Sequence, residues 1–104
     1  MNDANLLSAA RDAYARGAWG DAFGRLMAAD RQATLDPDAL ELAANVAFLT
    51  GRHEESVALW TRAHHELLAR GRALRAARAA FWLGFNLFQR GERAHGGGWI
   101  ARAR

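Results

Sequence analysis

The sequence predicts an all-α chain of about six helices joined by short connections. Apolar residues recur at steps of three and four along most of the chain, which is the spacing of one face of a helix. Strand signals are missing, because β-branched residues are scarce and no Asn-Gly or Asp-Gly turn separates alternating runs. Since short connections make successive helices antiparallel, we expect about three helical hairpins.

Glycine and proline set the expected bounds of the first three helices. The first lies between a cap at Asp3 and a stop at Gly17, and the second begins at Trp19. The pattern breaks over residues 32–35. Asp36-Pro37 then begins the third, since aspartate accepts free amide hydrogens and proline suits the first helical position. The apolar residues of these helices are Leu6, Ala9, Ala10, Ala13 and Tyr14, then Ala22, Phe23, Leu26 and Met27, then Leu40, Ala43, Ala44, Ala47 and Phe48.

Three further helices are expected after Gly51. The fourth ends near Gly71 and the fifth at Gly91, while glycines at 96–98 weaken the start of a sixth within 92–104. The expected apolar stripe of the fourth is Val57, Trp60, Thr61, His64, Leu67 and Leu68. That of the fifth is Leu74, Ala77, Phe81, Leu83, Phe85, Leu87 and Phe88.

Length and composition exclude several classes of protein. The 104 residues suit a single domain spanning 1–104. The chain has no cysteine, which excludes disulfides, thiol nucleophiles and cysteine-based metal sites. All fourteen basic residues are arginine and alanine is abundant, so we attribute the pI near 10.9 to coding bias more than to nucleic-acid binding. With no signal peptide and no apolar run near 18 residues, we expect a soluble, cytoplasmic protein.

An internal repeat is the most informative feature of the sequence. Gly17 and Gly51 are 34 residues apart, and Gly91 fits the same position in a third unit. In each unit the glycine lets the chain reverse, and a small residue five positions later allows two helices to approach closely. A bulky residue four positions further on fills the gap between them. A second small residue, three positions after that, allows contact with the next unit. The first two units place at these positions Ala22, Leu26 and Ala29, then Ser56, Trp60 and Ala63.

This pattern resembles the tetratricopeptide repeat (TPR), as do Leu83-Gly84 and the proline at 37. The resemblance covers nearly the whole chain, as approximate repeats 3–35, 36–71 and 72–104, and implies an α-solenoid. His53 and Arg93 depart from it where Trp19 supplies the expected aromatic. Carried over by position, the residues lining the concave groove of the family are Arg11, Tyr14, Glu41, Asn45, Phe48, Arg78, Phe81, Phe85 and Phe88.

A narrower resemblance links the chain to the N-terminal helical-repeat region of actinobacterial LuxR-type transcriptional regulators. It rests on the segments ARDAYARGAWGDAF, HEESVALWTRAHHELLARG and RGERAHGGGWIARAR, the last of which holds Gly-Trp-Ile-Ala-Arg-Ala at 98–103. That family implies a C-terminal helix-turn-helix, but this sequence contains no such element. We therefore expect no direct nucleic-acid contact from this segment.

Chemistry at a catalytic or metal centre is not expected. His64 and His65 are adjacent, so on a helix they point about 100° apart and cannot chelate one ion as an i, i+4 pair could. His64 falls on the apolar stripe, which favours a packed imidazole. Neither Ser8 nor Ser56 lies in a nucleophile motif, and the glycines at 96–98 lack a phosphate-binding context. We expect no enzyme activity, no cofactor and no metal.

Arginines at 70, 72, 75 and 78 form a basic cluster that could contact phosphate or an acidic partner, although a solvated face is the simpler interpretation. Most of the four tryptophans, Trp19, Trp60, Trp82 and Trp99, are expected to fill gaps between helices. The absence of lysine argues against the carboxylate clamp by which some TPR proteins hold chaperone tails.

The sequence therefore predicts a non-enzymatic module that binds a peptide or protein partner through a concave groove. The alternative is an effector-sensing or dimerisation region of a transcriptional regulator. A small-ligand site would require an enclosed pocket, whereas peptide binding requires an open groove. A short solenoid without a polar terminal helix exposes an apolar end, so we also expect a homo-oligomer, most simply a dimer.

Overall fold

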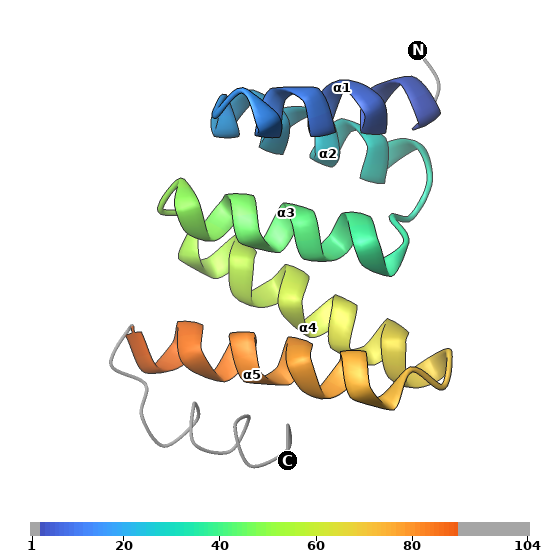
Figure 1. Cartoon of the computed structure of the whole chain (residues 1–104), viewed down its shortest axis with the longest axis vertical. Coiled ribbons are helices and arrows are strands. Elements are labelled where there is room, and N and C mark those ends of the chain that lie inside the picture. The colour runs from blue at the N-terminus through green and yellow to red at the C-terminus, as the bar shows by residue number, and fades with distance from the viewer. Residues whose placement is uncertain (1–2, 90–104) are drawn as a thin grey trace.

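The computed structural model describes residues 3–89, all of whose regular structure is helical (Figure 1). The helices are α1 (Asp3–Ala15), α2 (Trp19–Gln32), α3 (Pro37–Leu49), α4 (His53–Ala69) and α5 (Ala73–Gln89). The expected all-α class is confirmed. The expected sixth helix lies outside the described residues. Within 3–89, no helix is both long enough and apolar enough to cross a membrane.

The helices stack in chain order, each packed against the one before it (Figure 1). Helix α1 packs along α2, α3 along α4, and α4 along α5, whereas α2 and α3 meet over a smaller area. Because each successive helix reverses direction, α3 and α5 run parallel with α4 packed against both.

Three connections, each of three residues, have the same geometry. Gly17, Gly51 and Gly71 have φ of 78°, 77° and 73°, a left-handed conformation that glycine adopts without steric cost. Each glycine and the residue after it donate backbone hydrogen bonds to the last turn of the preceding helix, as in Gly51 N–Phe48 O at 3.2 Å and Arg52 N–Ala47 O at 2.8 Å. The next helix starts at once, because the Arg52 carbonyl already accepts from Ser56 N.

The connection between α2 and α3 is different and depends on two aspartates. Asp36 Oδ1 accepts from Ala39 N at 2.8 Å, which confirms the expected cap in front of Pro37. Asp30 Oδ1 accepts from Leu35 N at 3.3 Å, and the Asp30 carboxylate forms two hydrogen bonds, of 2.9 and 3.0 Å, with Arg62 of α4. Asp30 thereby fixes the connection and ties α2 to a helix beyond its immediate neighbour.

The helix-contact positions predicted from the 34-residue repeat are all buried. Leu26 is fully buried, Trp60 is 8% exposed, and the small residues at the neighbouring predicted positions are at most 1% exposed. The full set is Ala22, Leu26 and Ala29 in α2 and Ser56, Trp60 and Ala63 in α4. All six positions that the repeat predicts as helix contacts are therefore buried.

The predicted apolar stripes of α4 and α5 need correction. Leu68 is 52% exposed and Leu74 is 86% exposed, so neither belongs to the core. Because α4 is packed against α3 and α5, it buries a face wider than one stripe, which includes Leu59 and Ala63. In α5 the buried positions are mostly small, namely Ala76, Ala79, Ala80, Leu83, Gly84, Asn86 and Leu87, while Phe81 and Phe88 are about half exposed.

Gly51→Ala should lower the free energy of unfolding by about 1–2 kcal/mol, because an L-residue is strained at this positive φ. The matched control is Gly24→Ala in the middle of α2, where a new Cβ meets nothing within 4 Å. It should raise stability by roughly 0.5–1 kcal/mol, since alanine is the better helix former. Urea unfolding measures both, and equal effects would contradict the role of the turn.

Asp30→Asn should destabilise the protein at neutral pH and cost less in acid. The hydrogen bond from Arg62, supported by the one from Leu35, holds the pKa of Asp30 below its usual value despite partial burial. A lowered folded-state pKa gives stability that is present above the unfolded pKa of about 4 and is lost as pH falls through the folded value. Urea unfolding at pH 6 and pH 3 measures the difference between wild type and variant. Asp21→Asn, which removes exposed ion pairs, should have a smaller effect at pH 6.

Candidate functional site

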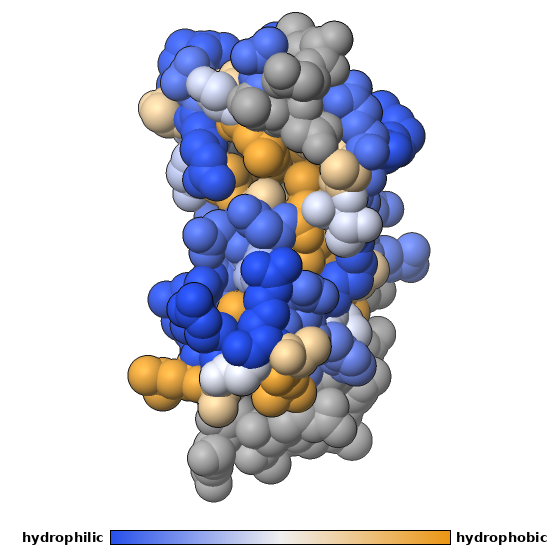
Figure 2. Space-filling view, turned by 90° about the vertical axis from the view of Figure 1, so that its right-hand side faces the viewer, coloured by the Kyte–Doolittle hydropathy of each residue, from blue (hydrophilic) through white to orange (hydrophobic). Residues whose placement is uncertain are grey.

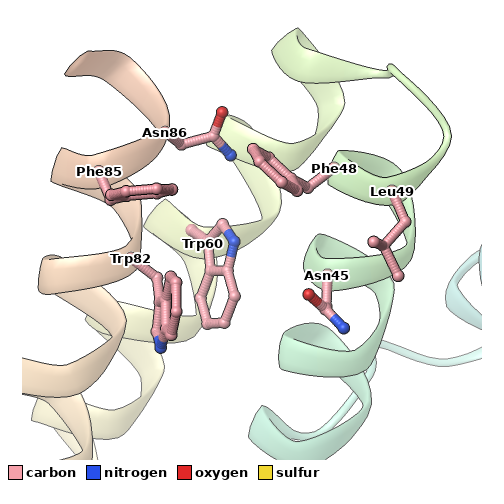
Figure 3. A pocket seen from close by; sticks show the side chains of 7 residues that line it. All are labelled: Asn45, Phe48, Leu49, Trp60, Trp82, Phe85 and Asn86. Atoms are coloured by element: carbon pink, nitrogen blue, oxygen red, sulfur yellow. The ribbon is translucent and has the colours of Figure 1, made fainter. Parts of the chain in front are cut away.

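A pocket of about 110 Å³ lies between α3 and α5, with α4 as its floor. Figure 3 shows Trp60 of α4 between the side chains of α5 on one side and those of α3 on the other. The lining residues are Asn45, Phe48 and Leu49 from α3, Trp60 from α4, and Trp82, Phe85 and Asn86 from α5. No charged residue lines the pocket, and four of the seven are aromatic.

The aromatic side chains of α5 form a connected row. Phe81 contacts Trp82 edge-to-face with ring centroids 5.6 Å apart, and Trp82 contacts Phe85 in the same way at 5.8 Å. Such edge-to-face pairs stabilise one another and hold the rings in fixed orientations. Phe81 is 46% exposed and Trp82 is 44% exposed, so the row presents apolar surface at the mouth of the pocket.

Asn45 presents a hydrogen-bond acceptor to the pocket. Its Nδ2 donates to the Tyr14 hydroxyl of α1 at 3.1 Å, which fixes the orientation of the amide. Figure 3 shows the Asn45 oxygen on the side that faces Trp60. The bond to Tyr14 also joins α1 to α3, so three odd-numbered helices contribute to this region.

Asn86 lies at the end of the pocket near Phe85 and Phe48 (Figure 3). Its Nδ2 donates to Ser56 Oγ at 2.7 Å, and that hydroxyl donates to the Ala44 carbonyl at 2.8 Å, so one chain of bonds joins α5, α4 and α3. Asn86 is 1% exposed and its Oδ1 is buried without a hydrogen-bond partner. A buried, unpaired acceptor typically costs about 1–3 kcal/mol.

The opposite end of the groove between α3 and α5 is closed by charge pairs. Arg75 Nη2 donates to Asp38 at 2.6 Å and to Glu41 at 3.0 Å, and Arg78 donates to the same Glu41 oxygen at 3.1 Å. The bonds to Asp38 and then Glu41 raise the pKa of Arg75 above its usual value. Figure 2 shows the side at which α3 and α5 begin, where hydrophilic residues cover the middle of the surface.

The residues predicted from the family's groove positions fall into three groups. Asn45, Phe48 and Phe85 line the pocket. Tyr14, Glu41 and Arg78 form the contacts that hold α1, α3 and α5 beside one another. Arg11, Phe81 and Phe88 are exposed on α1 and α5 and do not line the pocket.

Four pocket residues were not predicted. Trp60 was assigned to the core, and it is indeed almost buried, but its edge also forms the pocket floor. Most of the tryptophans are expected to fill gaps between helices, yet Trp82 is 44% exposed and Trp19 is 39% exposed. Leu49 and Asn86 had no sequence signal, apart from the position of Asn86 next to Phe85. Trp99 lies outside the described residues.

The other candidate residues behave as structural groups. His64 is 2% exposed and its Nδ1 lies 2.8 Å from the Ala76 carbonyl, so it joins α4 to α5 as a packed imidazole. In the basic cluster, Arg70 pairs with Glu66 at 2.8 Å, and Arg75 and Arg78 pair with α3. Three of the four arginines are therefore occupied by internal carboxylates.

Comparison with known proteins does not assign the chain to a family. No protein-family model matches the chain, and no curated protein sequence matches it.

Ser56→Ala should lower the free energy of unfolding by about 1–3 kcal/mol, because it leaves the buried Asn86 amide without its acceptor. Thr61→Ala is the matched control in the same helix, since its hydroxyl donates only to the Val57 carbonyl one turn away. That change should cost less than about 1 kcal/mol. Urea unfolding distinguishes the two, and a harmless Ser56→Ala would contradict the importance of the bond chain.

Proposed function

We propose that this chain is a TPR-like interaction module that binds a polypeptide partner without chemistry of its own. Three observations support the TPR-like arrangement. The helices form antiparallel hairpins in chain order, the left-handed glycines Gly17 and Gly51 are 34 residues apart, and the small residues that follow them at matching positions are buried. The third predicted repeat extends beyond the residues that the structure describes.

The observation that carries the proposed function is the aromatic pocket between α3 and α5. It is open to solvent beside the half-exposed Trp82, and it combines apolar rings with the Asn45 acceptor. Aromatic residues in a desolvated pocket are typical of the few positions that dominate the affinity of a protein interface. The preformed helices that hold the rings would reduce the entropy lost on binding.

The size of the pocket favours a polypeptide over a small effector. Sites for small molecules and cofactors are typically about 300–1,000 Å³ and bury most of the ligand. A pocket of about 110 Å³ is much smaller and holds one side chain of a larger partner. We therefore place peptide binding ahead of effector sensing by a transcriptional regulator.

Leu49→Arg should abolish capture of peptide ligands, because it puts a long charged side chain at the edge of the pocket. Leu49 is 40% exposed, so the arginine can remain solvated and the fold should persist. The measurement is enrichment from a phage-displayed library of random 12-residue peptides on the immobilised chain. The expected loss of enrichment is at least tenfold relative to wild type.

The matched control is Leu68→Arg, which makes the same substitution near the end of α4 at a side chain that is 52% exposed. This variant should retain the peptides selected by wild type. Circular dichroism should show equal helix content in all three proteins. Peptides that bind wild type and Leu49→Arg equally would contradict a binding site between α3 and α5.

A further inference from the structure

We propose that the pocket receives one uncharged aliphatic side chain, of leucine, isoleucine or methionine size, from an extended segment of a partner polypeptide. This inference rests on the proposed function and names the chemistry of its anchor residue. It is carried by the size of the pocket, the absence of charge in its lining, and the acceptor oxygen of Asn45.

The volume selects a small apolar group. An engineered protein cavity of roughly 150 Å³ holds benzene. The present pocket of about 110 Å³ is smaller and open on one side, so a phenyl or indole ring would extend out of it into solvent. A branched or flexible aliphatic chain fills it and contacts the faces of Phe48, Trp60 and Trp82.

The uncharged lining of the pocket disfavours an anchor residue of either charge. A carboxylate would meet the negative faces of the rings and find no arginine in the lining. A guanidinium would be attracted to the rings, but it would lose water without any carboxylate in the lining to replace it. The nearest acid along α3, Glu41, is already bonded to Arg75 and Arg78.

Asn45 selects the backbone conformation. Its Nδ2 donates to the Tyr14 hydroxyl, and its oxygen lies on the side of the pocket that faces Trp60 (Figure 3). The Asn86 oxygen is buried and points away from the rings, so Asn45 supplies the acceptor. An extended segment directs backbone N–H groups sideways while alternate side chains point into the surface. One of its N–H groups can then reach the Asn45 oxygen while the aliphatic side chain enters the pocket.

The experiment begins with the 12-residue peptides enriched on wild type over Leu49→Arg. One enriched peptide is synthesised with its candidate anchor residue changed to Ala, Met, Arg or Glu, and Kd is measured by the fluorescence of the tryptophans in the full chain. Ala, Arg and Glu should each weaken binding at least about tenfold, whereas Met should weaken it by less than about tenfold.

Backbone N-methylation of the same peptide tests the Asn45 acceptor. Methylating one nitrogen at or beside the anchor should weaken binding to wild type several-fold, and the same methylation should have no further effect on Asn45→Ala. The His53→Ala variant is a control at the rim, where His53 packs edge-to-face on Phe48 at 5.8 Å. It should keep the sensitivity to methylation.

Several outcomes would overturn this inference. Peptides that require an arginine, glutamate or aromatic anchor residue would overturn it while leaving peptide binding intact. It would also be overturned if N-methylation weakened binding to wild type and to Asn45→Ala equally, or weakened neither. No enrichment on wild type would instead reject the proposed function itself. A dimer in light scattering that dissociates in Leu49→Arg would assign the pocket to a second copy of this chain.

Discussion

Each tight hairpin in the described helices depends on one glycine in the left-handed conformation. At Gly17, Gly51 and Gly71 the chain reverses within a connection of three residues, and the residue after the glycine donates to one helix and accepts from the next. Because the connection is this short, each helix packs antiparallel to the one before it. Because the reversal point is fixed, the positions that face the neighbour are fixed too.

The pocket between α3 and α5 is a consequence of this register. Two successive tight turns bring α5 back alongside α3, with α4 behind both. Charge pairs from Asp38 and Glu41 to Arg75 and Arg78 hold the two parallel helices together at their beginnings. One to two turns further on, the side chains become large and aromatic, so the helices are bridged by rings that leave a space between them. The charge pairs at the start of α3 and α5 therefore help to position the aromatic residues further along the two helices.

Local signals in the sequence were sufficient for the fold class and the turns. Helical period, glycine spacing and the Asp36-Pro37 cap each act within a few residues, and the repeat added the buried small positions. The buried faces of α4 and α5 were predicted wrongly because they depend on how many helices pack around each one. That number is not encoded in the residues of the helix itself. Leu68 and Leu74 carry the right periodicity for a core residue but lie where no described helix covers them.

The composition of the pocket was predictable only in part for the same reason. Family positions selected Asn45, Phe48 and Phe85, which all come from odd-numbered helices. They could not select Trp60, since it comes from the helix behind, or the pairing of Asn86 with Ser56 thirty positions earlier in the chain. Polar contacts between distant segments appear only when the helices are placed.

The mutual pairing of charges along α3 and α5 has a kinetic consequence. Residues 3–89 contain ten arginines and ten acidic residues, so this part of the chain has no net charge with neutral histidines. A helical stack without net charge steers a partner only weakly from a distance, so the described helices contribute little to any salt-dependent rate of encounter. Differences in affinity among partners would arise from how long an anchor stays in the pocket, and not from how quickly it arrives.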